Sequence, residues 1–437
     1  MASPLAVRDP IHGWIKFSYE ERCLIDSPLV QRLRHIGQLT SVNLVYPGGN
    51  NTRFEHSLGA MHLASMYADV ILESTLFVPL EPEEKVKLKQ LLRVAALLHD
   101  IGHGPFSHSF DRTVYKKIYP TLDTQKEKKE KKEKKMDGHD LHRHYILQKD
   151  EKIRDAIHKL DIEPLMVCNV WNGAPDPNTP TQFDDFYEVL SATVQGPLGA
   201  DRMDFMMRDS YYTGTSHLGT IAHTRIIDHA WINDFRTSPH TDAPLSKVAL
   251  DLVQSRKMSL VYSEKILGDA THALNGRQYL YANVYLHKTS VAGSILIEKI
   301  LDSLPGLMDR TRDLEQFVFL NDMVIQEALH DPQLNHIAKR LLLRDLPKLV
   351  YQCQYVSEPT DIEKGIIDSY KYPSFITVYS RSIVGMEAAA FDKYGILFEA
   401  HDGDLYTCSE RLTGLGFQTQ QPYHIARVYS LQPTHTS

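Results

Sequence analysis

Residues 91–108 read LLRVAALLHDIGHGPFSH, so an apolar run leads directly into three histidines and an aspartate. The apolar run predicts a buried helix, and Gly102 and Gly104 predict where it stops. Ionisable side chains at the end of a buried helix are costly unless a partner compensates for their desolvation. Imidazole and carboxylate together suit a divalent cation. The stretch therefore predicts a metal site inside a mainly helical core.

Composition places the chain among ordinary soluble globular proteins. It has 437 residues, of which 42% are hydrophobic and 24% charged, enough for a large core. The net charge of −7 argues against general polyanion binding. We read no signal peptide and no run of about 18 apolar residues, so we expect no membrane partner and a cytoplasmic location, or a nuclear one in a eukaryote. The four cysteines form no CxxC pair and are expected to be reduced thiols.

Periodicity along the chain predicts a mainly α fold. Short strands are expected near residues 11–17, and mixed α and β structure is expected in a smaller C-terminal lobe. We place the domain boundary at 330, giving a core of 1–330 and an α+β lobe of 331–437. A basic, flexible insertion is expected at 121–137, because its Lys/Glu run is low in complexity. Helices are expected at 28–36, 54–67, 85–98, 200–209 and 255–300 (with a break near Gly276), and strands at 375–379 and 425–429.

Two sets of side chains can carry chemistry. The first can coordinate one metal ion (Mn, Fe, Mg, Co or Zn) with positions left for water and substrate. The second can handle protons, because histidine titrates near neutral pH. In the second set His142 and His144 remain alternatives to His139. The first set is His56, His99, Asp100 and Asp201, and the second is His103, His108, Asp111 and His139.

Three motifs carry a resemblance to a known family. RFEHSLG at 53–59, HDIGHGPFSH at 99–108 and DRMDFMMRD at 201–209 resemble HD-domain phosphohydrolases. The resemblance is greatest to the deoxynucleoside triphosphate (dNTP) triphosphohydrolases typified by the mammalian SAM- and HD-domain enzyme and its bacterial relatives. RDPIHG at 8–13 and the segment 26–39 fit the same family. The resemblance covers roughly residues 7–290, so we expect an all-helical HD-domain core and no SAM domain before it.

The resemblance also implies roles near the phosphates. The first set would be the metal ligands. His108 would donate a proton to the leaving 5′-oxygen, Asp111 would orient His108, and His103 and His139 would surround the α-phosphate. The phosphates themselves would be contacted by Arg53, Arg202 and Arg277, the last reaching the γ-phosphate.

The sugar site implied by the resemblance draws on several segments. Asp209 would bind the 3′-hydroxyl together with Gln38, and Leu39 would crowd a 2′-hydroxyl. Tyr285 and Tyr281 follow Arg277 at spacings of four residues, so the three lie on one helical face. Mammalian members have a histidine in place of Tyr281 and a tyrosine in place of Phe205.

A regulatory nucleotide is a further implication. Asp26, Gln31 and Arg34 match residues that bind an activating guanine nucleotide in the mammalian enzyme, although Leu5-Ala6 replaces a basic residue upstream. The same three residues also suit helix capping and a solvated face, and both interpretations stay open. GTP or a dNTP is thus a candidate activator, and a homodimer or homotetramer is the expected assembly.

The expected reaction is metal-dependent hydrolysis of dNTPs to deoxynucleoside and inorganic triphosphate, with Mg accompanying the substrate triphosphate. One alternative keeps the metal site and changes the substrate, giving a nucleotide phosphodiesterase or monophosphatase. The other is a non-catalytic nucleotide- or nucleic-acid-binding protein. Its direct support is the basic run 126–135, in which interspersed glutamates weaken a nucleic-acid contact.

Overall fold

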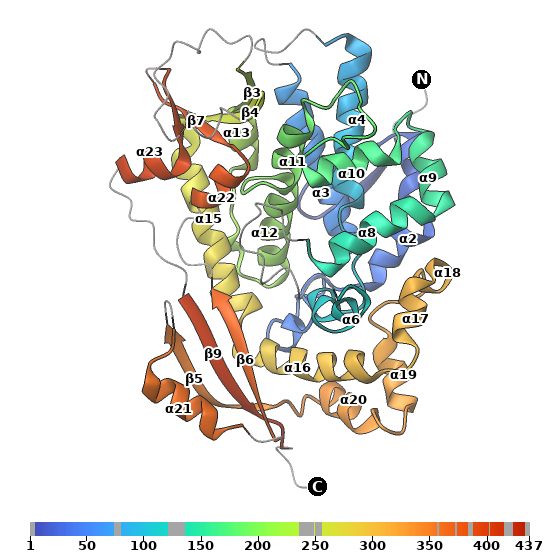
Figure 1. The fold of residues 1–437 in the computed structure, drawn as a ribbon, viewed down its shortest axis with the longest axis vertical. Coiled ribbons are helices and arrows are strands. Elements are labelled where there is room, and N and C mark those ends of the chain that lie inside the picture. The colour runs from blue at the N-terminus through green and yellow to red at the C-terminus, as the bar shows by residue number, and fades with distance from the viewer. Residues whose placement is uncertain are drawn as a thin grey trace.

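The computed structural model describes residues 5–73, 80–120, 136–235, 249, 256–355, 358–371, 374–382, 388–401, 403–414 and 423–432. The described chain is mainly helical, with short N-terminal strands and small sheets in its C-terminal part, which confirms the predicted fold class (Figure 1). Residues 121–135 of the predicted basic insertion lie outside the described residues. Among the described helices, none is long and apolar enough to cross a membrane.

The N-terminal part begins with a hairpin and continues as helices. Strands β1 (Leu5–Asp9) and β2 (Gly13–Phe17) pair in antiparallel fashion. Two π-helical turns, η3 (Asp111–Tyr115) and η7 (Tyr281–Tyr285), interrupt the α-helices. The α-helices up to residue 330 are α1 (Tyr19–Ile25), α2 (Pro28–Gln31), α3 (Arg53–Ile71), α4 (Pro82–Leu98), α5 (His108–Phe110), α6 (Lys116–Ile118), α8 (Gly138–Lys149), α9 (Glu151–His158), α10 (Pro164–Asn172), α11 (Tyr187–Gln195), α12 (Ala200–Tyr212), α13 (His223–Asp228), α15 (Leu267–Leu280), α16 (Lys288–Ser303), α17 (Leu307–Arg312), α18 (Leu314–Phe317) and α19 (Val324–His330).

Helix α3 lies at the centre of the core, packed against α4 on one side and α12 on another. Its buried face includes Leu58, Met61 and Leu63, which are shielded from water almost completely. Gly59 allows α12 to approach closely, because a Cβ atom at this position would lie 1.8 Å from Asp204 Oδ1. These three helices bring the N-terminus of α3, the C-terminus of α4 and the N-terminus of α12 to one place.

The prediction of a helix over 255–300 is wrong at its start, and the break that it places near Gly276 lies elsewhere. Residues Met258–Ser263 form strand β4, which lies between β3 (Ala230–Asp234) and β7 (Leu397–Glu399). A continuous apolar run suits a buried strand as well as a buried helix, and the sheet partners decide. Gly276 lies inside α15, where Leu218 O would be 2.1 Å from an added Cβ, and the break falls at η7 instead.

The helix predicted at 28–36 begins at Pro28 as expected but tightens after Gln31. Residues Arg32–His35 form a 3₁₀ turn, η1. Arg32 is fully buried, and its guanidinium donates to the carbonyl oxygens of Ile101 at 2.9 Å and His103 at 2.7 Å. A third hydrogen bond reaches Leu320 O at 2.9 Å. The turn thus joins the N-terminal segment to the motif at 99–108.

Two sheets occupy the C-terminal part, and both predicted strands are confirmed within them. Strands β6 (Phe375–Ser382) and β9 (Tyr423–Ser430) pair with each other, in a sheet of order β5-β9-β6. The second sheet has the order β3-β4-β7-β8, and β7 pairs in parallel with β4 across the predicted domain boundary. The remaining elements are α20 (Asn335–Leu342), β5 (Lys348–Tyr355), α21 (Asp361–Ser369), α22 (Ala388–Lys393), β8 (Leu405–Thr407) and α23 (Cys408–Gly414).

Candidate active site

The four predicted metal ligands converge where α3, α4 and α12 meet. His56 lies in the first turn of α3, His99 and Asp100 follow the end of α4, and Asp201 lies in the first turn of α12. His56 Nε2 is 3.2 Å from His99 Nε2 and 3.1 Å from Asp201 Oδ1. Asp100 completes the group, with Oδ2 3.8 Å from His56 Nε2 and Oδ1 3.3 Å from His99 Nε2.

The Nδ1 nitrogens of His56 and His99 each have a hydrogen-bond acceptor of their own. His56 Nδ1 lies 2.7 Å from Asp204 Oδ2, and His99 Nδ1 lies 2.7 Å from the carbonyl oxygen of Ala96. In the neutral rings these acceptors favour the proton on Nδ1, which leaves each Nε2 lone pair to bind a cation beside two carboxylates. A metal-bound histidine usually donates the N–H of its other ring nitrogen to an acceptor of this kind. The donor set fits a divalent cation.

Electrostatics favours positive charge at the same point. Burial opposes charging of the His56 imidazole, yet Asp201 and Asp204 raise its pKa to about 10. Burial also opposes ionisation of Asp201, but the hydrogen bonds from His56 and His99 lower the pKa of its carboxyl. A bound cation would supply the positive charge that a proton on His56 otherwise supplies beside these carboxylates. His56, His99 and Asp100 also form a group whose ligand atoms lie within 4.8 Å of one another.

Asp204 is the buried acceptor that holds His56. Its Oδ1 lies 2.7 Å from His12 Nε2, and Arg208 donates to its two oxygens at 2.9 Å each. Arg208 in turn donates to Asp9 Oδ2 at 2.8 Å. Sequence reasoning assigned no role to these residues. The spacing of Asp201, Asp204 and Arg208 on one helical face was the available signal.

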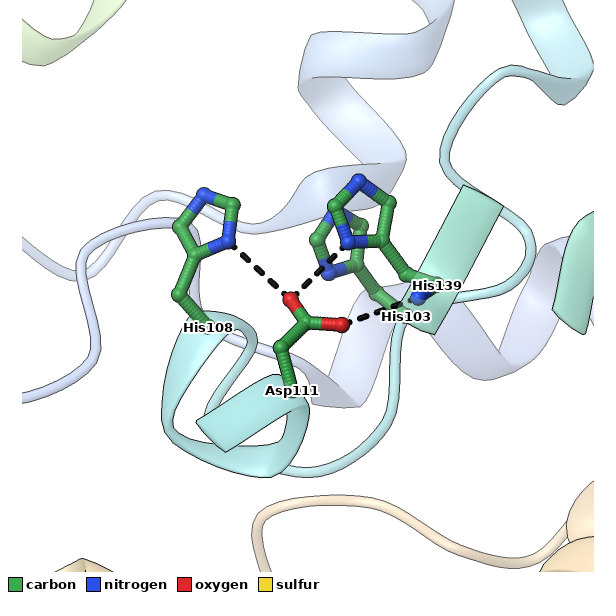
Figure 2. Close-up of side chains that lie close together, drawn as sticks. All are labelled: His103, His108, Asp111 and His139. Carbon is green, nitrogen blue, oxygen red and sulfur yellow. Dashed lines mark hydrogen bonds and ion pairs between the residues drawn. The ribbon is translucent and has the colours of Figure 1, made fainter. Parts of the chain in front are cut away.

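The second predicted set also comes together, around Asp111 (Figure 2). Asp111 Oδ2 lies 3.1 Å from His108 Nδ1 and 2.8 Å from His139 Nδ1, and Asp111 Oδ1 accepts the backbone N–H of His139 at 2.8 Å. The His103 ring stacks on the His139 ring, with centroids 3.8 Å apart and planes 18° apart. Of the alternatives to His139, His142 lies against Phe317 with ring centroids 4.4 Å apart, and His144 lies against Trp171.

The histidines of this set differ in charge. Burial opposes charging of His139, but Asp111 raises its pKa to about 9. Burial and the nearby Arg53 guanidinium hold the pKa of His103 well below its usual value. His103 Nε2 also lies 3.3 Å from Asp100 Oδ1, so the two sets are neighbours. His108 is the most exposed of the group, with its side chain 59% accessible, and Nε2 is the ring nitrogen that Asp111 leaves free (Figure 2).

The turn between His103 and His108 is strained, and hydrogen bonds from distant segments hold it. Phe106 and Ser107 have φ values of 56° and 55°, a left-handed conformation that costs energy in residues other than glycine. The backbone N–H of Phe106 donates to Asp322 Oδ1 at 2.6 Å, and Arg53 Nε donates to Ser107 Oγ at 2.7 Å. Arg53 Nη1 also donates to Asp100 Oδ2 at 2.5 Å. Arg53, which was predicted to contact phosphate, is therefore bound to one of the predicted metal ligands. Sequence reasoning missed Asp322, because 216 residues separate it from Phe106.

A cavity of about 820 Å³ opens beside His108 and gathers the predicted sugar residues. Asp209 accepts from Tyr285 Oη at 2.7 Å and from Asn51 Nδ2 at 2.9 Å. Burial raises the pKa of Asp209 to about 6 despite these donors. Gln38 Oε1 is buried there with no hydrogen-bond partner among the described residues. The predicted residues that line the cavity are Gln38, Leu39, Arg53, His108, Phe205, Asp209, Tyr281 and Tyr285.

Two predicted arginines lie close together beside the metal ligands. Arg202 follows Asp201 directly, and burial together with the charge of Arg277 lowers its pKa. Its Nη1 is buried with no hydrogen-bond partner in the part of the chain that the structure describes. The Arg277 guanidinium lies 5.2 Å from the centre of the Tyr281 ring and is buried. Two like charges held together in this way favour an anionic ligand.

Two of the three predicted regulatory residues contact each other, and the third contacts a different residue. Arg34 Nε donates to Gln31 Oε1 at 2.8 Å, and its guanidinium lies 3.6 Å from the centre of the Phe54 ring. Asp26 accepts instead from Arg22 Nε at 3.0 Å. Asp26 and Arg34 are exposed and Gln31 is half-buried, so all three can be reached from solvent.

Comparison with known proteins agrees with this geometry. The family model "HD domain" matches residues 53–164, which include three of the four predicted metal ligands and the whole second set. In solved structures, a hypothetical protein from Aquifex aeolicus superposes with a TM-score of 0.71 at 22% identity, covering 98% of this chain and 96% of that one. A phosphohydrolase from Bacteroides thetaiotaomicron superposes with a TM-score of 0.67 at 20% identity, covering 98% and 100%. Residues 53–164 therefore form an HD domain, and the chain shares its fold with these two solved structures.

Sequence relatives narrow this class. The deoxynucleoside triphosphate triphosphohydrolase SAMHD1 of Mus musculus is 29% identical over 375 residues, and the match covers 79% of this chain. Uncharacterized protein MJ1154 of Methanocaldococcus jannaschii is 26% identical over 389 residues, covering 89% of this chain and 67% of its own. The chain spans only 54% of the length of the mouse relative. The chain thus contains an HD domain and is similar, over most of its own length, to dNTP triphosphohydrolases.

Proposed function

We propose that the protein hydrolyses dNTPs to deoxynucleoside and inorganic triphosphate. The observation that carries the proposal is the position of two arginines, Arg277 buried and Arg202 half-buried, beside the predicted metal ligands, with the buried Arg202 Nη1 lacking a partner among the described residues. A monophosphate would give such a pair little to bind, whereas a triphosphate offers several anionic oxygens to guanidinium donors. The named activity of the mouse relative supports the same reaction.

The chain's own residues would position the substrate for an attack at the α-phosphorus. A divalent cation held by His56, His99, Asp100 and Asp201 would, when bound, polarise a phosphoryl oxygen. Arg202 and Arg277 would hold the β- and γ-phosphates, with Mg accompanying the triphosphate, and Arg53 would steady Asp100 while its cavity-facing side contacts phosphate. Positioning and charge stabilisation would supply most of the rate enhancement.

Proton transfer falls to His108. Asp111 occupies Nδ1 of His108 and leaves Nε2 to carry a proton toward the cavity. As the water oxygen bonds to the α-phosphorus and releases a proton to solvent, the bond from phosphorus to the 5′-oxygen breaks, and His108 protonates that oxygen. His139 and His103 would surround the α-phosphate from the neighbouring set.

The sugar would lie in the cavity. Asp209 and Gln38 would bind the 3′-hydroxyl, and the unpartnered Gln38 Oε1 is available to accept from it. Leu39 lines the same space, where it would crowd a 2′-hydroxyl, and Phe205, Tyr281 and Tyr285 also line it. Deoxynucleotides are therefore the preferred substrate in this proposal.

Regulation and assembly complete the proposal. Asp26, Gln31 and Arg34 would bind an activating GTP or dNTP, supported by their accessibility and by the contact between Arg34 and Gln31. A homodimer or homotetramer is the proposed assembly, and the proposed location is cytoplasmic, or nuclear in a eukaryote.

Product analysis tests the reaction. Purified protein is incubated with each dNTP and NTP, with and without GTP, and triphosphate, pyrophosphate and phosphate are separated by anion exchange. We expect triphosphate from dNTPs, and the double variant His99→Ala/Asp100→Ala should lose metal content and triphosphate release together. Phosphate as the product would favour the monophosphatase alternative, and full activity of the double variant would contradict the proposal.

A paired substitution tests the proton donor. His108→Gln should retain the metal, because His108 is not among the four ligands, and should lower kcat by about 10²–10⁴-fold. His158→Gln is the matched control, because His158 lies on α9 with its side chain 42% accessible. Equal turnover in the two variants would remove His108 from the mechanism.

A further inference from the structure

The far wall of the cavity comes from the C-terminal part of the chain. Four consecutive residues of β6, Ile376 to Tyr379, line it. Successive side chains of a strand point to opposite faces, so four consecutive residues reach one cavity only when the strand presents its edge. In the described part of the chain β6 pairs with β9 and with no other strand, which leaves its second edge free. Figure 1 places β6 on the side of the sheet nearest α16.

Helix α16 forms the opposite wall. Val291, Ile295, Glu298 and Asp302 recur at helical spacing and all line the cavity. Val291 and Ile295 are buried and apolar, and they come before the charged pair along the helix. The space between α16 and β6 therefore has an apolar part next to a strand edge that carries hydrogen-bonding groups.

The position of this space relative to the proposed substrate identifies its occupant. The cavity lining includes Asp209 and Tyr285, where the sugar is proposed to bind, and Arg53 and His108, which are proposed to act at the α-phosphate. It does not include Arg202 or Arg277, which are proposed to hold the β- and γ-phosphates. Residues 376–379 have no role toward the phosphates or the sugar, so the space beside β6 is left for another part of the nucleotide. The part of a nucleotide that remains is the base.

We propose that the free edge of β6, at residues 376–379, recognises the nucleobase of the substrate through backbone hydrogen bonds and determines base preference. This inference rests on the proposed function. Ile376, Thr377 and Val378 are half-buried, so the free backbone groups of this edge are only partly able to bind water. A base supplies donors and acceptors along its own edge, and its flat face packs on Val291 and Ile295.

A pair of proline substitutions tests the edge, because proline removes one backbone N–H. Adjacent N–H groups of an antiparallel strand point in opposite directions. Of Thr377→Pro and Val378→Pro, one therefore removes an N–H directed at β9 and the other an N–H directed at the cavity. We expect the variant that loses the N–H directed at β9 to have a lower Tm. The variant that loses the N–H directed at the cavity should keep its Tm and change the ratio of kcat/KM between two dNTPs by about tenfold or more. Unchanged ratios in a variant with unchanged Tm would overturn the inference.

Amide hydrogen exchange tests the same edge without substitution. The wild-type protein is compared with and without a saturating dNTP analogue in which a methylene group replaces the 5′-oxygen, so that the bond broken in the proposed reaction is absent. Exchange at residues 376–379 should slow, while β5, at the opposite edge of the same sheet, should not change. Saturation is established separately by calorimetry. Bound analogue with unchanged exchange in β6 would refute the inference even when both proline variants unfold.

The two proposals fail differently. If dNTPs bind and protect β6 but no triphosphate is released, the proposed reaction fails and base recognition by β6 stands. If triphosphate is released and β6 is not protected, the reaction stands and the inference fails. If neither dNTPs nor the analogue bind, both are contradicted.

Discussion

Asp204 shows at the scale of one residue how the metal ligands are held in place. It accepts from His56, His12 and Arg208 and is completely buried. Asp204→Asn keeps the side-chain volume but removes the charge and one acceptor. We expect metal affinity to fall about 10–100-fold, which is typical when a second contact of a metal-bound histidine is lost.

The measurement is a metal titration of the variant by calorimetry, at a temperature where circular dichroism shows a folded chain. Asp155→Asn on α9 is the control, because Asp155 is exposed and lies outside the site. Wild-type metal affinity in Asp204→Asn would mean that His56 is oriented without this carboxylate.

The residues of the site differ in how far sequence could identify them. His56, His99, Asp100 and Asp201 were predictable, because their types and motifs point to one chemistry, and the structure brings them within contact of one another. The groups that hold them were not. His12 contacts Asp204 across 192 positions, and Asn51 contacts Asp209 across 158, so no local pattern records either contact.

At the scale of elements, the turn that carries His108 depends on a distant loop. Asp322, between α18 and α19, accepts from the backbone N–H groups of Phe106 at 2.6 Å and Gly37 at 2.8 Å, one with each oxygen. In Asp322→Asn one of the two N–H groups would face an amide NH₂. We expect the free energy of unfolding to fall by about 1–3 kcal/mol, as measured by urea denaturation.

The same carboxyl predicts a pH dependence. Burial raises the pKa of Asp322 to about 6, from an ordinary value of 3.8. The folded chain therefore binds this proton more tightly than the unfolded chain does. The contribution to stability is fully present below the unfolded pKa and declines as pH rises through about 6. The difference in unfolding free energy between wild type and Asp322→Asn should accordingly be larger at pH 4.5 than at pH 7.5. A difference that grows with pH would contradict the assignment.

Secondary structure was predictable where the pattern of apolar residues suited only one kind of element. The apolar spacing of α3 and α4 suits only a buried helix, and both were located correctly within a few residues. Residues Met258–Ser263 suit a strand or a helix equally, and their neighbours in the sheet settled the matter. The π-turn at Tyr281–Tyr285 left no recognisable signal, although it directs both tyrosines into the cavity.

At the scale of the whole molecule, the proposed lobe 331–437 is joined to the core by a shared sheet. Val261 of β4 lies opposite Leu397 of β7, and the two side chains are buried in one apolar cluster. A chain ending at residue 331 would expose this cluster, and each buried aliphatic side chain contributes about 1.5–3 kcal/mol. We expect the shortened chain to unfold at a lower temperature, or to be insoluble, when compared with the full chain by circular dichroism. Equal Tm values would show that the core folds independently of the lobe.

The sequence by itself determined the helical class, and it predicted the four metal ligands and the neighbouring histidine set, because each depends on residue type and spacing within short segments. Tertiary structure alone decided how the motif at 99–108 is held: by Arg32 and Asp322 on its backbone, and by Arg53 on its side chains. It also decided that a strand of the C-terminal lobe closes the cavity beside His108. The physical reason is that a hydrogen bond or a sheet pairing between distant segments depends on where the chain packs, and no local periodicity encodes that position.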